Sequence, residues 1–224
     1  MRLLIVNPNT SLSTTQRIAD AAQAVALPGD DFVTCRAAFG PELIVTPEDG
    51  AEAARGVVAT VRQHPGKPDG IVLASFGDTG AEDVRRIWPD IPVIGIAEAA
   101  FATVRRLDGP FAIVTFAPEV AQPLEEKAIQ HGAGAALLRV ATLQTALSGD
   151  PAEMADDLAE PLAELCRACA EDGAESIVLG GGPLAGLSKR IAPHCPVPVI
   201  DGTQEAITQM RAQLAVHSRE DMAK

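Results

Sequence analysis

The sequence contains no tyrosine and a single tryptophan, and aromatic residues make up only 3% of its 224 positions. It also lacks an excess of positive charge: 18 Lys and Arg residues stand against 30 Asp and Glu residues, a formal net charge of −12. Nucleic acids are bound mainly by basic surfaces and aromatic stacking, and anionic membranes are bound by basic surfaces. We therefore expect neither a nucleic-acid partner nor a membrane partner.

A long apolar segment is missing as well. No run of 18 apolar residues occurs, so no membrane span is predicted. The apolar stretch near the N-terminus, Leu3–Val6, is too short for a signal peptide and instead predicts a strand. A cytoplasmic location is the expectation that follows.

The four cysteines do not have the spacing of a zinc site. Cys166 and Cys169 form one Cys-x-x-Cys inside a predicted helix, with no second pair and no matching histidines. Helix packing is the favoured interpretation, with a metal or redox role as the alternative. No metal site is predicted.

The sequence repeats itself at an offset of 106 residues. The segment Ile71–Gly80 (IVLASFGDTG) aligns with Ile177–Gly186 (IVLGGGPLAG), and Pro92–Gly95 aligns with Pro198–Asp201. An apolar run that ends in a glycine-rich turn is typical of a buried parallel strand and its loop. We therefore predict an α/β fold of two pseudo-symmetric halves, each a mainly parallel sheet flanked by helices, with an active-site cleft between them.

The best break in the chain is Asp108-Gly109-Pro110. It predicts an N-terminal half over residues 1–108, a C-terminal half over 109–203, and a C-terminal helix and tail over 204–224. Within the second half the pattern predicts helices over 117–131 and 184–192 and a strand over 135–140; the last helix is expected over about 204–217. Ligands bind beyond the carboxyl ends of parallel strands. The loops expected there are 7–11, 75–80, 115–118 and 180–186.

The loop after the third strand carries the most promising side chain. Ser75 is expected to face a ligand, either as a hydrogen-bond donor or as a nucleophile, and a nucleophile would need an adjacent base. Asp78 is the nearest carboxylate in sequence, and no histidine is nearby. The motif is not the Gly-x-Ser-x-Gly elbow of hydrolases. A plain turn remains the alternative.

Two further loops offer mainly backbone groups. Gly180–Gly186 has no reactive side chain, and its amides predict either an anion site or a tight turn that needs glycine. Asn7–Ser11 ends a strand and begins a helix, which suits a carboxylate or imide oxygen, or an ordinary helix cap. The residues predicted to bind substrate are Asn7, Asn9, Thr10, Phe76, Gly77, Thr79, Thr115, Gly182 and Pro183.

The other ionisable candidates have structural interpretations. His64 and His131 are expected at the C-terminal ends of helices, where a cationic imidazole complements the helix dipole. Glu98 and Asp201 follow strands closely and are expected to serve helix N-termini, with a catalytic carboxylate as the alternative for each.

Taken together, these motifs resemble the aspartate/glutamate/hydantoin racemase superfamily, and its hydantoin racemase branch most closely. The resemblance extends over nearly the whole chain. It implies two pseudo-symmetric halves, no cofactor, a small carboxylate or cyclic imide such as a hydantoin bound between them, and a homo-oligomer. The matching segments are Leu4–Ser11 (LIVNPNTS), Gly40-Pro41, Ser75–Asp78 (SFGD), Pro92–Ala99 (PVIGIAEA) and Val178–Gly180 (VLG).

The chemistry of that superfamily depends on two cysteines, one in each half, that move the proton next to a carbonyl or carboxylate. By motif position they correspond to Ser75 and Gly181, and neither is a cysteine. A thiol can be tuned to exchange a proton near neutral pH, whereas a serine hydroxyl is far less acidic and glycine has no side chain. The segment Glu42–Thr46 also lacks the small-Ile-Glu pattern expected of hydantoin racemases.

Three functions therefore stay open. The first is an isomerase-like enzyme with altered chemistry, in which Ser75 donates a hydrogen bond or relays a proton and the amides around Gly181 and Gly182 stabilise an oxyanion. The second is a hydrolase or lyase that uses Ser75 or an activated water. The third is a non-catalytic protein that binds a small molecule. The positions predicted as catalytic are Ser75, Gly181 and Asp78.

Overall fold

The fold consists of two four-stranded parallel sheets with the same strand order. The computed structural model of the protein describes residues 1–144 and 150–222. The first sheet has the order β2 (Asp31–Arg36), β1 (Arg2–Asn7), β3 (Gly70–Leu73), β4 (Val93–Gly95). The second has the order β6 (Leu137–Thr142), β5 (Phe111–Thr115), β7 (Ser176–Leu179), β8 (Val199–Asp201). All six strand pairings are parallel, and the predicted fold class is confirmed.

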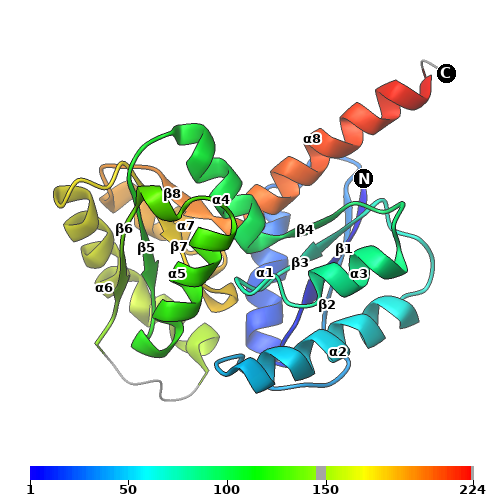
Figure 1. Ribbon diagram of the computed structural model, residues 1–224, viewed down its shortest axis with the longest axis horizontal. Coiled ribbons are helices and arrows are strands. Elements are labelled where there is room, and N and C mark those ends of the chain that lie inside the picture. Colours follow the sequence, from blue (N-terminus) through cyan, green and yellow to red (C-terminus); the bar gives the residue numbers. More distant parts are fainter. Residues whose placement is uncertain (145–149, 223–224) are drawn as a thin grey trace.

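Helices cover both faces of each sheet, so the central strands are buried (Figure 1). Nearly every residue of β1, β3, β5 and β7 is inaccessible to solvent, which explains their continuous apolar sequences. The edge strands β2 and β6 are more exposed. The helices are α1 (Leu12–Gln23), α2 (Pro47–Gln63), α3 (Ala81–Ile87), α4 (Ile96–Leu107), α5 (Ala121–Gln130), α6 (Pro151–Glu171), α7 (Ser188–Ile191) and α8 (Gly202–Met222).

Several predicted boundaries in the second half are wrong. A 3-10 turn, η1 (Pro118–Val120), precedes α5, and another, η2 (Gly134–Ala136), delays β6 by two residues. The helix predicted over 184–192 is divided among η3 (Gly182–Leu184), α7 and η4 (Ala192–His194). Gly186 at φ 82° lies in the left-handed region, which no helix continues through. α8 begins two residues earlier than expected and extends to Met222.

A shared hydrophobic core joins the two halves. One cluster of buried side chains includes Leu3 and Ile5 of β1 together with Phe111 and Ile113 of β5. Phe101 of α4 is fully buried in this cluster, with its ring centroid 6.1 Å from that of Phe111. Since burying a large apolar side chain contributes about 1.5–3 kcal/mol, separating the halves would expose much of the core. The halves therefore share one buried core, although the strand pattern is duplicated.

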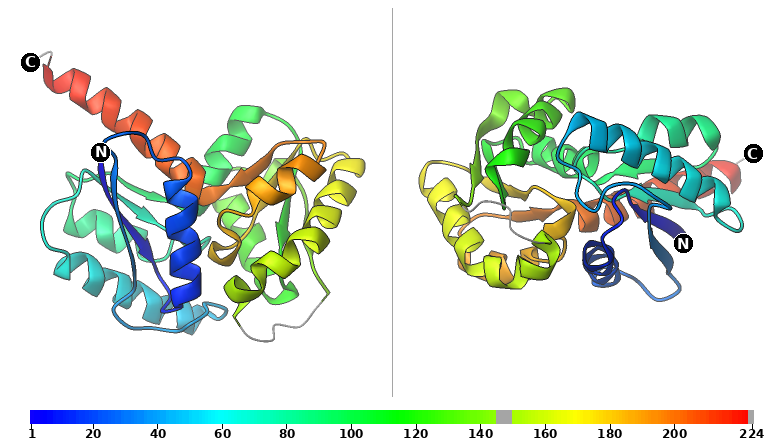
Figure 2. Two further views of the ribbon diagram at one scale, coloured as in Figure 1. Left: turned by 180° about the vertical axis from the view of Figure 1, so that it is seen from behind. Right: turned by 90° about the horizontal axis from the view of Figure 1, so that it is seen from below.

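The last helix crosses from the second half to the first. α8 follows β8 of the second sheet, and its first residue, Gly202, abuts α4: a Cβ there would lie 2.6 Å from the carbonyl oxygen of Ile96. Further along, the buried side chain of Met210 packs against Gly70 of β3. Figures 1 and 2 show its last turns projecting beyond the first half. The part of the chain that the structure describes has no helix long and apolar enough to cross a bilayer.

Polar contacts tie the N-terminus of α1 to that of α6. Asp150 is the N-cap of α6, where Oδ1 accepts from the amide of Ala152 at 2.8 Å. Its other oxygen accepts from Ser11 Oγ at 2.7 Å and from Ser13 Oγ. Burial alone would raise the pKa of Asp150, but the hydrogen bonds from Ser13, Ser11 and Ala152 hold that pKa below its usual range. The charged carboxylate is therefore the form that stabilises the folded protein.

The close approach of α8 and α4 predicts that Gly202→Ala is destabilising. The new methyl group would overlap a backbone oxygen, so the free energy of unfolding should fall by about 1–3 kcal/mol. Gly50→Ala in α2 is the matched control. A Cβ at this position would meet no atom within 4 Å, and the substitution replaces a glycine inside a helix. It should raise stability by about 0.5–1 kcal/mol. Urea unfolding measures both, and equal effects would contradict the packing described.

The Asp150 contact predicts a pH-dependent effect. At pH 7 Asp150→Ala should lower the free energy of unfolding by about 1–2 kcal/mol, through loss of the cap and of both serine contacts. Because the folded-state pKa is lowered, this contribution is present above the unfolded value near 3.9 and disappears as the pH falls through the folded value. Urea titrations from pH 7 to pH 3 test it, with exposed Asp157→Ala as control. A difference that stays constant with pH would refute the assignment.

Candidate active site

A cavity of about 330 Å³ lies where the strand ends of the two halves meet. This volume suits a small ligand. The first half contributes the ends of β1 and β3 and the segment before α2, and the second contributes the ends of β5 and β7 and one face of α5. The lining residues are Asn7, Asn9, Leu43, Ile44, Val45, Thr46, Pro47, Ala74, Ser75, Phe76, Gly77, Thr79, Phe116, Val120, Pro123, Leu124, Glu126, Lys127, Gln130, Gly180, Gly181, Gly182 and Pro183.

The two repeated loops touch each other at this cavity. Gly182 lies against the carbonyl group of Ala74, since a Cβ on Gly182 would be 3.0 Å from that oxygen. Gly181 adopts φ 136°, a conformation that disfavours other residues, and a Cβ there would lie 2.9 Å from Cε1 of Phe116. Ser75 and Gly181 therefore line the same cavity, one from each half. The space that a side chain at position 181 would need is already taken by the Phe116 ring.

Ser75 interacts with its own loop. Its Oγ donates to Thr79 Oγ1 at 3.0 Å and accepts from the Thr79 amide at 3.3 Å. Among the described residues, no imidazole or carboxylate forms a hydrogen bond to this hydroxyl. The side chain can donate to or accept from a ligand, but it has no general base to activate it as a nucleophile.

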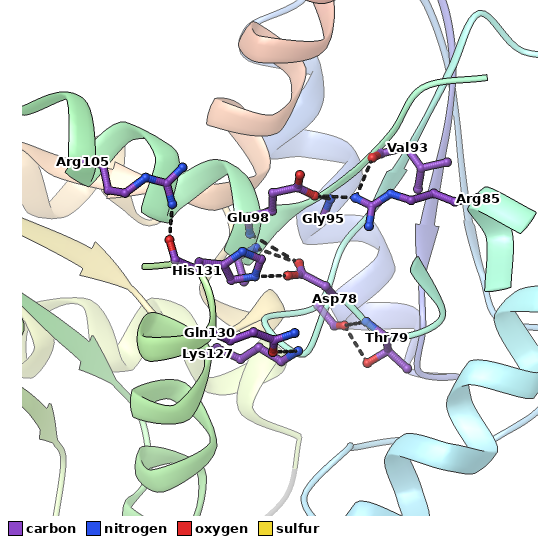
Figure 3. A network of polar contacts seen from close by, with 12 residues as sticks. Asp78, Thr79, Arg85, Val93, Gly95, Glu98, Arg105, Lys127, Gln130 and His131 are labelled. Atoms are coloured by element: carbon purple, nitrogen blue, oxygen red, sulfur yellow. Dashed lines mark hydrogen bonds and ion pairs between the residues drawn. The ribbon is translucent and has the colours of Figure 1, made fainter. Parts of the chain in front are cut away.

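Asp78 points toward the N-terminus of α4 and toward His131 (Figure 3). Its Oδ1 accepts from the amides of Ala97 at 3.2 Å and Glu98 at 3.5 Å, and Oδ2 lies 2.7 Å from Nε2 of His131. The residue is in the left-handed region, at φ 48°. Gly95 makes room for it, because a Cβ on Gly95 would be 1.8 Å from Oδ1. Asp78 therefore holds the loop of Ser75 in place and is not among the lining residues.

The contact of His131 with Asp78 is not predicted by the sequence. His131 ends α5 as the C-cap residue, as expected, but its ring also stacks on Phe101 at 5.9 Å and meets Asp78 of the other half. The side chain is 19% exposed and that of Asp78 is 9% exposed, so the contact is largely shielded from water. The two residues are 53 positions apart, and no local pattern links them.

Other predicted ligand residues support the loops. Asn7 and Asn9 line the cavity, and Nδ2 of Asn7 donates to Oδ1 of Asn9 at 2.6 Å. Thr10 donates to the carbonyl of Gly40, and the fully buried Thr115 donates to the carbonyl of Gly180 at 2.6 Å. Neither threonine is among the lining residues. Phe76, Gly77, Thr79, Gly182 and Pro183 do line the cavity.

A pair of carboxylates caps equivalent helices in the two halves from different positions. Asp201 is buried in the second half and accepts from the amides of Thr203 at 2.9 Å and Gln204 at 3.3 Å. At the 106-residue offset these amides correspond to those of Ala97 and Glu98, which Asp78 caps in the first half. The other oxygen of Asp201 accepts from the amide of Gly186 at 2.6 Å. Burial raises the pKa of Asp201, although its amide hydrogen bonds act to lower it.

The cavity has no thiol. None of the four cysteines is among its lining residues, and Cys166 and Cys169 are on the buried face of α6. Burial raises the pKa of Cys166 to about 12, so its reactive thiolate form is scarce at neutral pH. Among the described residues, no group of three or more His, Cys, Asp or Glu side chains is arranged to hold a metal ion.

Comparison with known proteins identifies the family. The model of the family described as Asp/Glu/Hydantoin racemase matches residues 3–210. The chain belongs to this racemase family. A hydantoin racemase of Paenarthrobacter aurescens is 36% identical to it over 213 residues, which cover 92% of this chain and 88% of that protein.

Solved structures agree with this racemase assignment. Allantoin racemase from Klebsiella pneumoniae superposes with a TM-score of 0.88 at 35% identity, over 97% of this chain and 89% of that one. Allantoin racemase from Pseudomonas fluorescens gives a TM-score of 0.87 at 30% identity, over 97% and 92% of the two chains. The superfamily and fold predicted from the motifs are thus confirmed.

For this racemase-family member, the position of Asp78 predicts a structural effect. Asp78→Ala should lower the free energy of unfolding by about 1–3 kcal/mol, because the α4 amides and His131 lose a buried partner. Asp83→Ala, on the exposed face of α3, should change stability by less than about 0.5 kcal/mol. Thermal and urea unfolding measure both. If Asp78→Ala were as stable as Asp83→Ala, the cap and the contact between halves would not be significant.

Proposed function

We propose that the protein is a cofactor-independent enzyme that acts at the carbon next to a carbonyl or carboxylate of a small, hydantoin-like or carboxylate substrate. The observation that carries the proposal is the meeting of Ser75–Thr79 and Gly180–Pro183, one loop from each half, at a single cavity. The names of the relatives, hydantoin racemase and allantoin racemase, support cyclic ureides as the first substrates to test.

The mechanism follows from the groups that the cavity offers. Removing a proton next to a carbonyl creates an enolate-like oxyanion, and donors aimed at that oxygen lower the barrier. In the proposed complex the carbonyl oxygen lies against the backbone of Gly181 and Gly182, where the absence of side chains permits close approach. The hydroxyl groups of Ser75 and Thr79 face the substrate from the first half. There they donate hydrogen bonds, or they relay the proton from the reacting carbon to a water molecule, and a proton from water returns to that carbon.

The chemistry differs from a two-thiol racemisation. Gly181 has no acid or base, and Phe116 fills the adjacent space. Proton transfer on the side of the cavity formed by Gly181 must therefore use water or the substrate itself, so turnover should be slow. A hydrolase or lyase that uses Ser75 as nucleophile receives no support from the geometry, because Ser75 Oγ is hydrogen-bonded to Thr79 and, among the described residues, not to a base. The form of this alternative that uses an activated water stays a prediction.

Deuterium exchange tests the proposal. Enantiopure 5-substituted hydantoins, allantoin and amino acids are incubated with enzyme in D₂O, and NMR follows exchange at the reacting carbon while polarimetry follows racemisation. At least one substrate should exchange faster than the enzyme-free blank, and Ser75→Ala should slow that exchange about tenfold or more. Thr208→Ala, an exposed substitution on α8, is the matched control and should behave like wild type.

The outcomes separate the alternatives. Binding without exchange across the whole panel would indicate a non-catalytic binding protein. Full activity in Ser75→Ala would remove the serine from the mechanism. As a gain-of-function arm, Ser75→Cys with Gly181→Cys introduces the two thiols. A cysteine at position 181 needs both a backbone change from φ 136° and displacement of the Phe116 ring, so accelerated exchange is expected only if the loop accommodates both changes.

A further inference from the structure

A cation lies in the cavity wall of this acidic protein. Among the described residues that line the cavity, Lys127 of α5 is the one positively charged side chain. All other lining residues are uncharged except Glu126. With a net charge of −12, the protein as a whole repels anions, so a local ammonium group determines which sign of charge the cavity accepts.

Among the described residues, the ammonium group of Lys127 has a single hydrogen-bond partner. Nζ donates to Oε1 of Gln130 at 2.8 Å in a solvent-exposed hydrogen bond, and Lys127 as a whole is partly buried. An ammonium has three protons, so donors remain for a ligand. Figure 3 shows Lys127 and Gln130 extending from α5 toward the loop that carries Asp78 and Thr79.

Glu126 does not neutralise this charge. Its carboxylate accepts from Nε2 of Gln122 at 3.0 Å, one turn earlier on α5, in an exposed hydrogen bond. No ion pair joins Glu126 to Lys127 among the described residues. The lysine therefore keeps its charge available to the cavity.

The contact between the halves holds Lys127 where it is. His131 directly follows the last turn of α5, and its Nε2 lies 2.7 Å from Asp78 Oδ2 on the opposite half. Arg105 of α4 also donates to the carbonyl oxygen of His131. The end of α5 is thus joined to the loop of Ser75 through Asp78 and to α4 through Arg105. These contacts position the helix that carries Lys127 with respect to the cavity.

We propose that Lys127 binds a carboxylate of the substrate. The preferred substrates of this cavity then carry a negatively charged carboxylate on a substituent of the reacting carbon. This inference rests on the proposed function. It narrows the proposed substrates to those that carry a carboxylate and excludes neutral ureides as preferred substrates. The lysine selects and orients the substrate. Stabilisation of the oxyanion and hydrogen bonding at the reacting carbon are still assigned to the loops of the two halves.

Binding of two matched probes tests the inference without requiring turnover. Hydantoin-5-acetate carries a carboxylate, and 5-methylhydantoin has the same ring without it. Isothermal titration calorimetry at low salt should show at least tenfold tighter binding of the acid by wild type, with an affinity that falls as salt is added. Lys127→Met should abolish that preference, and Lys127→Arg should retain part of it.

Lys189→Met is the control, because Lys189 is exposed on α7 and is not a lining residue. It should bind both probes as wild type does. Equal binding of the two probes by wild type, or an unchanged preference in Lys127→Met, would overturn the inference. Deuterium exchange at the ring carbon of both hydantoins is measured in parallel: exchange with no acid preference refutes only the role of Lys127, whereas exchange of neither hydantoin nor any other substrate of the panel refutes the proposed function. Circular dichroism verifies that each variant is folded.

Discussion

The close contact between Gly182 and the Ala74 carbonyl is the constraint on which the site depends. Two parallel sheets of the same order can share a cavity only if the carboxyl ends of their central strands face each other. Here the backbones approach so closely that a methyl group at position 182 would lie 3.0 Å from a carbonyl oxygen. The buried core around Phe101 holds the sheets in this relation, and the loops at their ends enclose the cavity.

The two halves cap the N-termini of equivalent helices with carboxylates from different positions. The helices that follow β4 and β8 each begin with exposed backbone donors, and a carboxylate near these donors is stabilising. In the second half the N-cap residue Asp201 supplies it. In the first half the equivalent residue is Gly95, and Asp78 supplies the carboxylate from the preceding loop. Because Asp78 also meets His131, it joins the Ser75 loop, α4 and α5 in one network.

The chemical character of the cavity differs from what its family membership implies. The fold and the superfamily are those of racemases, whereas the two loop positions predicted from the motifs to correspond to the superfamily's thiols, Ser75 and Gly181, hold a hydroxyl group and a glycine. Function depends on a site and not on a fold alone. The polar groups that line the cavity are hydroxyl groups, side-chain amides, backbone groups, the ammonium group of Lys127 and the carboxylate of Glu126. None of them is a thiol, so proton exchange here needs a different chemistry from that of two cysteines.

The sequence by itself determined the duplicated α/β fold, the two loops of the site and the superfamily, because these depend on short apolar runs and on motifs of neighbouring residues. It did not reveal the contact of Asp78 with His131, nor that Asp78 and Thr115 hydrogen-bond within the protein and lie outside the lining of the cavity. It also offered no sign that Lys127 faces the cavity. Those features depend on residues more than fifty positions apart and on the direction in which a side chain leaves its loop or helix. Only the packing of one half on the other decides which carboxylate caps a helix, which hydroxyl supports a loop and which lysine enters the cavity.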